Sequence, residues 1–282
     1  MRHVLGGASD LEVVGHARDG LEALEQIEAL APDVVTLDLM MPQLDGLGVL
    51  QALSTRAVRP RVVVVSSSAS DSDIALEALQ LGALDIVHKP TAVATDRLYD
   101  LGDDLLMKVR AAASSGVAVA PLPTPTKPPP PPVVGTTTSA RTSVIVVGTS
   151  TGGPQALVHL ASRFPADLPV PVAAVLHIPI GYTASLAARL DRISALAVVE
   201  AEEGLVVMPG MMVIARAGVH LLLERSGRGA RCVLATEPRR SLHVPSVDAL
   251  FTSAAAAFAK GVLAAVCTGM GEDGLAGARA VR

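Results

Sequence analysis

Aromatic residues and cysteines are scarce in this sequence of 282 residues. It contains two Tyr, three Phe and no Trp, so few side chains are available for nucleobases to stack on. The two cysteines, Cys232 and Cys267, are too few and too far apart for a disulfide framework or a zinc cluster, which indicates a reducing compartment. We expect each of them to be a small core residue.

A surplus of positive charge and a long apolar run are also missing. Lys and Arg number 23 against 27 Asp and Glu, so the formal net charge is -4 and there is no basic surplus to neutralise phosphates. This balance argues against a nucleic-acid partner. No apolar run reaches the roughly 18 residues that cross a bilayer, and no basic segment followed by an apolar one opens the chain. We therefore expect a cytoplasmic protein without direct membrane insertion.

Proline is abundant in one stretch, residues 111–142, which reads AAASSGVAVAPLPTPTKPPPPPVVGTTTSART. Because proline fixes φ and has no N–H donor, this stretch predicts an extended tether rather than part of a core. A ligand for an SH3-type domain is the alternative. We expect one domain over residues 1–110, the linker over 111–142 and a second domain over 143–282.

Short β-branched runs alternate with helical patterns on both sides of this linker, which predicts α/β domains with parallel sheets covered on both faces. The expected strands are residues 11–15, 33–39, 61–68 and 85–90, then 143–148, 170–178 and 260–269. Residues 204–235 have the turn density of β-hairpins.

Three polar residues follow strands expected in the first region. Asp38 comes after the run DVVTL, Ser66 after RVVVV and Lys89 after DIVH. Ligands of open α/β sheets gather at the carboxyl ends of the strands, so these side chains would meet at one edge. A carboxylate, a hydroxyl and an ammonium can make an acyl phosphate site with Asp38 as the nucleophile. The alternative is a turn residue, a helix cap and a solvated lysine.

The segments DVVTLDLMMPQLDG, VVVVSSSAS and HKP resemble those of response-regulator receiver domains, and the similarity covers most of residues 1–110. The resemblance implies a flavodoxin-like domain in which Asp38 accepts a phosphoryl group from a histidine kinase. It further implies that Asp38 helps to hold Mg²⁺, that Ser66 and Lys89 sense the phosphate, and that a cis peptide precedes Pro90.

Two features depart from the receiver pattern. The family's first strand, which ends in an acidic pair that helps to hold Mg²⁺, is missing before residue 1, so we expect the chain to be truncated there. Ile86 stands where the family often has a switch aromatic residue, which argues against signalling by ring rotation.

The second region opens with VIVVGTSTGG, residues 144–153. These letters fit both a Gly-rich phosphate cradle and the G-x-S-x-G pattern that exposes a nucleophile, here Ser150. A dinucleotide site would place an acidic residue at the end of the second strand, about 20 residues past the glycines. His177 stands there instead, and an imidazole can take the proton of a serine hydroxyl. The glycines of the turn are then expected to leave room for a substrate carbonyl: Gly148, Gly152 and Gly153.

A hydrolase site needs a carboxylate at another strand end. The segment KGVLAAVCTGMGEDG supplies Asp273, which could fix the tautomer of His177 and stabilise its imidazolium. The order Ser150, His177, Asp273 differs from that of the α/β hydrolases, so a separate fold is expected. Rival bases and acids stay open: His220, His243, Glu272 and Asp248. Each main candidate also has a structural explanation, as a helix cap, a strand-end histidine or a turn former.

Five segments of the second region resemble the chemotaxis protein-glutamate methylesterase (CheB) family: GTSTGGPQAL, LHIPIGYTASLAARL, EAEEGLVVMPGMMVIARAGVHLLL, HVPSVDALFTSAA and TGMGEDG. The resemblance covers about residues 143–282 and implies a doubly wound, mainly parallel-sheet domain. It implies hydrolysis of glutamate methyl esters on methyl-accepting chemotaxis receptors, with deamidation of receptor glutamines as a second activity. Ser150 is then the nucleophile, His177 the general base and Asp273 the orienting carboxylate, and catalysis needs no cofactor.

The resemblance also sets expectations for regulation and extent. Backbone N–H groups near Thr151, Gly152 and Met270 are expected to bind the oxyanion. An unphosphorylated receiver is expected to block the Ser150 edge until phosphate on Asp38 releases it. The family pattern continues past residue 282 with a further helix and strand region, so we expect truncation there as well.

Two other functions remain alternatives at this point. One is a phosphorylation-dependent interaction protein with a degenerate hydrolase domain. The other is a nucleotide-binding regulator.

Overall fold

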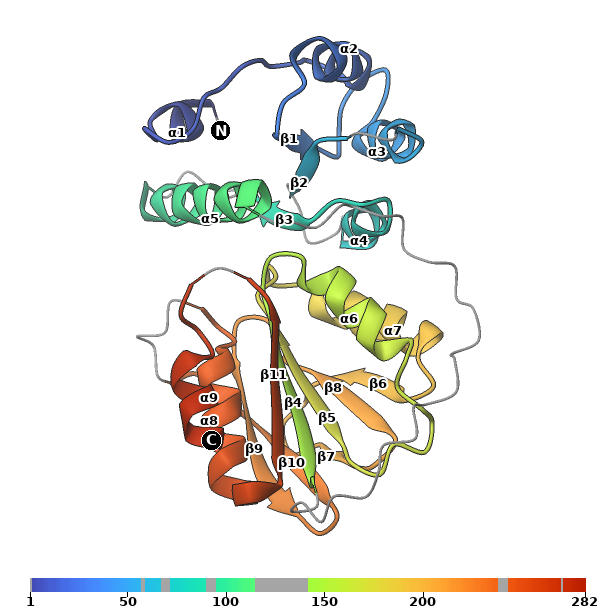
Figure 1. Ribbon diagram of the computed structural model, residues 1–282, viewed down its shortest axis with the longest axis vertical. Helices are drawn as coiled ribbons and strands as arrows, with labels where there is room; N and C mark the ends of the chain where they lie inside the picture. Colours follow the sequence, from blue (N-terminus) through green and yellow to red (C-terminus); the bar gives the residue numbers. More distant parts are fainter. Residues whose placement is uncertain are drawn as a thin grey trace. The chain divides into compact units, whose positions relative to one another are not determined.

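The chain forms two compact units, residues Met1–Leu122 and Pro123–Arg282, in a computed structural model (Figure 1). The structure describes residues 2–56, 59–66, 72–89, 95–114, 142–237, 243–269 and 271–282. Most of the predicted linker, residues 115–141, therefore lies outside the described residues. Residues 111–114, which the sequence placed in that linker, are the last residues of a helix.

The first unit is built on a parallel sheet of three strands in the order β1-β2-β3. The strands are β1 (Val34–Asp38), β2 (Arg61–Ser66) and β3 (Asp85–His88). Its helices are α1 (Arg2–Gly6), α2 (Gly20–Leu30), α3 (Gly46–Ser54), α4 (Ser72–Gln80) and α5 (Thr95–Ser114). Figure 1 shows α5 on one side of the strands and α3 and α4 on the other, as expected for a parallel sheet covered on both faces. The central strand β2 is almost completely buried, which explains its run of four valines.

The strand predicted at residues 11–15 is wrong. These residues form no strand, and the side chains of Val13 and Val14 are 40% and 49% exposed. Among the described residues, β1 pairs only with β2. β-branched residues favour a strand when they pack against neighbouring strands, and this segment has none to pack against.

The second unit contains a parallel sheet of five strands in the order β11-β4-β5-β8-β6. The strands are β4 (Val144–Thr149), β5 (Val172–Leu176), β6 (Ala197–Glu200), β8 (Met211–Ile214) and β11 (Val262–Thr268). In Figure 1, α6 (Gly153–Ala161) and α7 (Thr183–Ile193) cover one face, and α8 (Val247–Phe258) and α9 (Leu275–Val281) cover the other. A short 3₁₀ helix, Ala259–Gly261, joins α8 to β11. The doubly wound, mainly parallel arrangement predicted from the sequence is confirmed.

A second, antiparallel sheet of three strands in the order β7-β10-β9 packs under α8. It comprises β7 (Val206–Val207), β9 (His220–Ser226) and β10 (Gly229–Ala235). The hairpins predicted over residues 204–235 are confirmed for β9 and β10, and β7 pairs antiparallel with β10 without forming a hairpin. The exception is β8, which pairs with β5 and β6 in the parallel sheet. Its run MMVI is mostly buried, as is typical of a strand inside a parallel sheet.

The main core of the second unit lies between the parallel sheet, α8 and the antiparallel sheet. Cys232 belongs to this core, and burial raises its pKa to about 12, so its thiol stays protonated. The same expectation is wrong for Cys267, which is exposed. Cys267 lies on β11, which is an edge strand among the described residues and whose residues are partly buried or exposed.

Candidate active site

The three polar residues predicted at the sheet edge of the first unit lie together. Asp38 and Ser66 are the last residues of the neighbouring strands β1 and β2, and Lys89 directly follows β3. The Lys89 ammonium donates a hydrogen bond to Asp38 Oδ2, and the Lys89 backbone N–H donates to the Ser66 carbonyl at 2.6 Å. Ser66 is buried, whereas the Asp38 and Lys89 side chains are 27% and 33% exposed. Solvent can therefore reach the carboxylate.

The donor set near Asp38 does not by itself fit Mg²⁺. One Asp38 oxygen accepts the Lys89 bond and the other accepts the Met40 N–H at 3.2 Å. Within the part of the chain that the structure describes, no three His, Cys, Asp or Glu side chains gather as a metal site would need. Mg²⁺ binds through carboxylates and other hard oxygens in octahedral geometry, so Asp38 would need further donors. The peptide before Pro90, expected to be cis, lies outside the described residues.

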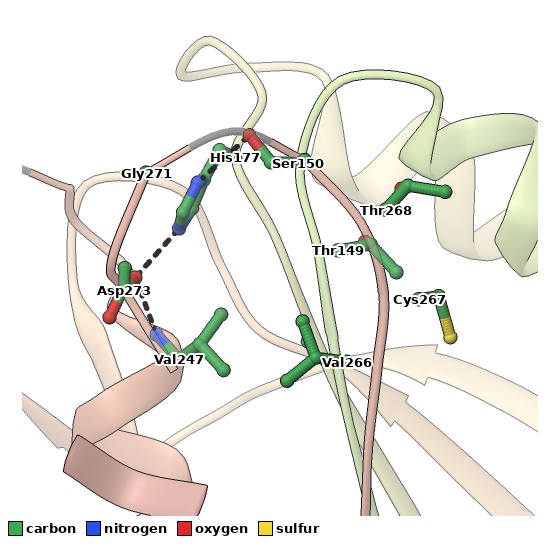
Figure 2. A pocket seen from close by; sticks show the side chains of 11 residues that line it. Thr149, Ser150, His177, Val247, Val266, Cys267, Thr268, Gly271 and Asp273 are labelled. Atoms are coloured by element: carbon green, nitrogen blue, oxygen red, sulfur yellow. Dashed lines mark hydrogen bonds and ion pairs between the residues drawn. The ribbon is translucent and has the colours of Figure 1, made fainter. Parts of the chain in front are cut away.

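In the second unit, Ser150, His177 and Asp273 form a continuous chain of hydrogen-bonding distances (Figure 2). Ser150 directly follows β4, His177 directly follows β5, and Asp273 lies in the turn between β11 and α9. His177 Nδ1 lies 3.2 Å from Ser150 Oγ, and Nε2 lies 2.9 Å from Asp273 Oδ2. The ring nitrogens therefore face the opposite way from the chymotrypsin arrangement, in which Nε2 faces the serine.

The sheet topology explains why these residues meet. β4 lies between β5 and β11, so the strand order reverses direction there. Open parallel sheets bind ligands at such a switch point, outside the carboxyl ends of the strands. Two backbone bonds hold the edge together: His177 N–H donates to the Thr149 carbonyl at 3.2 Å, and Ser150 N–H donates to the Thr268 carbonyl at 2.9 Å.

The Asp273 carboxylate is held at the N-terminus of α8. It accepts hydrogen bonds from the Ser246 hydroxyl at 2.8 Å, the Val247 N–H at 2.8 Å and the Asp248 N–H at 2.9 Å. Burial alone would raise the pKa of Asp273, but the bonds from His177 and from these groups hold it well below its ordinary value. Asp273 is therefore an anion facing His177, stabilised by the positive end of the helix dipole.

The alternative candidates for the base and the carboxylate do not belong to the Ser150–His177–Asp273 chain. His220 is fully buried and its Nδ1 accepts the Ser246 N–H at 3.1 Å, while Glu272 is exposed. His243 stacks on the ring of His177, with centroids 4.0 Å apart. Asp248 directs its carboxylate to the backbone of α9, where Oδ1 accepts the N–H groups of Gly274 and Gly277.

The glycines of the turn have two different roles. A Cβ at Gly148 would lie 2.4 Å from Val247 Cγ1, and a Cβ at Gly153 would lie 2.3 Å from Leu176 Cδ1. Both glycines permit close packing of the neighbouring side chains, and Gly148 also lines the pocket beside Ser150. Gly152, with φ of 76°, is the N-cap of α6 and has open space around it. The N-cap of α6 is therefore Gly152 and not Ser150, whose Oγ lies within hydrogen-bonding distance of His177 Nδ1.

A pocket of about 160 Å³ opens beside Ser150 and His177. It is lined by residues of the strand ends, of the turn after β11 and of the start of α8, and Figure 2 shows Val266 on the side of β11 that faces Val247 and Cys267 on the opposite side. Thr151 and Gly152, expected near the oxyanion, directly follow the nucleophile. Met270, expected there as well, lies outside the described residues.

Sequence reasoning missed two contributors to this site. Gly269 approaches the nucleophile so closely that a Cβ on it would lie 2.7 Å from Ser150 Cβ. Ser246 donates to Asp273 and is the N-cap of α8, accepting the Ala249 N–H at 3.3 Å. A serine directly before an apolar helical pattern is an N-cap signature, so the cap could have been found from the sequence, but its bond to Asp273 could not.

Comparison with known proteins agrees with this arrangement. Residues 145–282 match the model of the CheB methylesterase family, and residues 1–100 match that of the response regulator receiver domain. Protein-glutamate methylesterase/protein-glutamine glutaminase 5 of Myxococcus xanthus is 55% identical over 282 residues, which cover 100% of this chain and 80% of that protein. The chain belongs to the CheB methylesterase family.

A further relative and a solved structure are also similar to this chain. The protein-glutamate methylesterase/protein-glutamine glutaminase of Geobacillus kaustophilus is 41% identical over 272 residues, covering 96% of this chain and 78% of that one. The crystal structure of the Thermotoga maritima CheB methylesterase catalytic domain shares 37% identity, covers 50% of this chain and 75% of that chain, and has a TM-score of 0.48. In the residues that the structure describes, no helix is long and apolar enough to cross a membrane.

Proposed function

We propose that this chain hydrolyses glutamate 5-methyl esters on methyl-accepting chemotaxis receptors, and that it also deamidates receptor glutamines. The observation that carries the proposal is the Ser150–His177–Asp273 chain at the switch point of the sheet, in a member of the CheB methylesterase family. Relatives across the full chain carry both activities in their names.

In the proposed reaction, Ser150 Oγ attacks the ester carbonyl carbon while His177 Nδ1 takes the hydroxyl proton. The anionic Asp273 stabilises the resulting imidazolium through Nε2–H. When the tetrahedral intermediate collapses, the C–O bond to the methoxy group breaks and Nδ1–H protonates it, so methanol leaves. Water then attacks the acyl-serine with the same base and frees the γ-carboxylate and Ser150. With a glutamine substrate the first leaving group is ammonia.

The negative oxygen of the tetrahedral intermediate needs hydrogen-bond donors that are already in place. We assign this role to backbone N–H groups of Thr151 and Gly152, which follow Ser150, with Met270 as a further expected contributor. Each such donor contributes about 3 to 4 kcal/mol to stabilising the transition state.

Control is proposed to come from the receiver domain, with a histidine kinase as phosphoryl donor and Asp38 as acceptor. Asp38 is partly exposed, and the Lys89 ammonium beside it offsets the negative charge that phosphorylation adds. A bound Mg²⁺ would supply positive charge to the phosphoryl group; Asp38 would be one of its ligands, and further donors would be needed. Phosphorylation would then shift the population between arrangements that block and expose the Ser150 edge.

The test is methanol release from membranes that carry methylated receptors. Ser150→Ala should lower the rate by at least about 10³-fold, because it removes the hydroxyl that His177 activates to form the acyl intermediate. Ser162→Ala is the matched control, since the Ser162 hydroxyl donates to the His159 carbonyl at the end of α6, and it should leave the rate unchanged. An unchanged rate in Ser150→Ala would overturn the proposal.

A fluorophosphonate probe separates this function from its alternative. The wild-type chain should be labelled at Ser150, because the probe reacts with an activated serine. An interaction protein with a degenerate hydrolase domain would take no label.

A further inference from the structure

Two carboxylates in the second unit bind the backbone at the starts of two helices reciprocally: Asp273, just before α9, binds the start of α8, and Asp248, in α8, binds the start of α9. Asp273 precedes α9 but binds the Val247 and Asp248 N–H groups at the start of α8. Asp248 lies in α8, but its Oδ1 accepts the Gly274 N–H at 3.0 Å and the Gly277 N–H at 2.6 Å at the start of α9. The two segments therefore hold each other through four backbone hydrogen bonds.

The Asp248 side chain supplies a cap that α9 lacks. The N-cap residue of α9 is Gly274, which has no side chain, and no side-chain bond from the cap itself is present. Free N–H groups in the first turn of a helix need an acceptor, and a carboxylate is among the best. Asp248 meets this need from the neighbouring helix.

Close packing makes the arrangement sensitive to this side chain. A Cβ at Gly277 would lie 2.5 Å from Phe251 Cβ and 3.1 Å from Asp248 Cα, so α9 sits directly against α8. Gly274 adjoins Asp273 in the chain and has φ of 105°. The bond from Gly274 N–H to Asp248 therefore fixes the backbone at the point where the Asp273 side chain leaves it.

We propose that Asp248 is a positioning residue of the hydrolase site. By holding the turn at Gly274, it keeps the Asp273 carboxylate in line with His177 Nε2. The inference rests on the proposed hydrolytic function and deepens it. Asp248 touches neither the substrate nor the reacting atoms, and it acts through Asp273 alone.

Two substitutions at position 248 test whether the oxygen acceptor of this side chain is needed for hydrolysis. Asp248→Asn keeps an oxygen acceptor for the Gly274 and Gly277 N–H groups, whereas Asp248→Ala removes it. Asp191→Ala is the matched control, because Asp191 Oδ1 also accepts a backbone N–H, that of Val198 at 2.8 Å, in the same unit but outside the site.

The experiment measures methanol release and the rate of fluorophosphonate labelling of Ser150, both per folded molecule. Asp248→Ala should lower kcat by about 10²-fold, because a small misplacement of the orienting carboxylate costs that much, while KM stays close to that of the wild type. Asp248→Asn should restore most of kcat, and Asp191→Ala should match the wild type. The low-field proton resonance of the His177 Nε2–H bond should be present in the wild type and Asp248→Asn and lost in Asp248→Ala.

The outcomes distinguish the inference from the function on which it rests. If Asp248→Ala is folded and has the kcat and the low-field resonance of the wild type, the inference is overturned while the hydrolase stands. If Asp248→Ala does not fold, Asp248→Glu takes its place, since it keeps the charge and moves the acceptor by one methylene; an undiminished kcat there also overturns the inference. A wild-type chain that releases no methanol and takes no probe overturns the proposed function, and the inference with it.

Discussion

The imidazole ring of His177 lies flat against that of His243, with the ring centroids 4.0 Å apart and the planes 17° from parallel. His177 is thus held at both nitrogens by Ser150 and Asp273 and on one face by a second ring. A ring fixed in this way loses little orientation when it accepts and returns a proton.

Removing the stacked ring should slow hydrolysis. Stacking of aromatic rings contributes about 0.5 to 1.5 kcal/mol beyond the buried area, so His243→Ala is expected to lower kcat by up to about 10-fold. His243→Phe keeps a flat ring in the same place and should retain most of the activity. Steady-state rates of methanol release measure both variants, and a phenylalanine variant as slow as the alanine variant would contradict the stacking explanation.

A methyl group at Gly269 should disturb the nucleophile. Gly269 and Gly271 both have positive φ, 140° and 106°, so alanine at either position costs about 1 to 3 kcal/mol of backbone strain. Only at Gly269 would the new Cβ meet Ser150, at 2.7 Å from its Cβ, whereas Gly271 has nothing within 4 Å. Gly269→Ala should therefore lose most of its rate of Ser150 labelling, while Gly271→Ala loses stability but keeps the rate per folded molecule. Equal rates in the two variants would show that the approach to Ser150 does not matter.

The contribution of Asp273 to the free energy of unfolding should decrease at acidic pH. Its pKa in the folded chain lies below the ordinary carboxyl value of about 4. The stabilisation is therefore fully present above pH 4 and is lost as the pH falls toward the folded-state pKa. Asp273→Asn should be less stable than the wild type at pH 5, and the difference should shrink as the pH falls below about pH 4. Urea unfolding of both proteins over this range gives the free energies, and a difference that does not change with pH would contradict the assignment.

A buried ion pair in the first unit offers a test of its packing. The Lys108 ammonium is buried, donates to the Ile86 carbonyl at 2.6 Å and lies 3.3 Å from Asp85 Oδ1 and 3.4 Å from Asp104 Oδ2. Burial alone would lower the pKa of Lys108, but the two carboxylates raise it, so the amine is charged. Lys108→Met leaves Asp85 buried without its partner and should cost about 3 to 5 kcal/mol of folding free energy.

The double variant Lys108→Met/Asp85→Asn removes both charges and should recover much of that loss. Thermal unfolding of the two variants measures the difference. A double variant no more stable than Lys108→Met would show that the lost charge on Asp85 is not the cause.

Strand ends were the part of the site that the sequence predicted well. Buried parallel strands are continuous β-branched runs, so the ends of β4, β5 and β11 were visible, and the residues that follow them are Ser150, His177 and the turn with Asp273. Parallel strands present their carboxyl ends at one edge of a sheet, and this rule predicts that the three side chains meet.

Contacts between segments were the part that the sequence did not predict. From the sequence, Asp248 was an alternative to Asp273 as the carboxylate of the site. The segment Ser246–Asp248 does not show that the Asp248 carboxylate binds the start of α9. Two predictions were wrong for a related reason: the strand at residues 11–15 and the burial of Cys267. Propensity and composition describe single segments, while the neighbours that a segment finds decide pairing and burial.

The three groups of the site are unevenly spaced along the chain, and we expect this spacing to influence the order in which their contacts form during refolding. Ser150 and His177 are 27 residues apart, whereas His177 and Asp273 are 96 residues apart. Contacts between distant residues close larger loops and form later than local ones. A chain that has regained its central strands can thus pair its serine with its histidine and still be inert. The return of hydrolysis during refolding would then report the time at which the Asp273 turn and α9 dock.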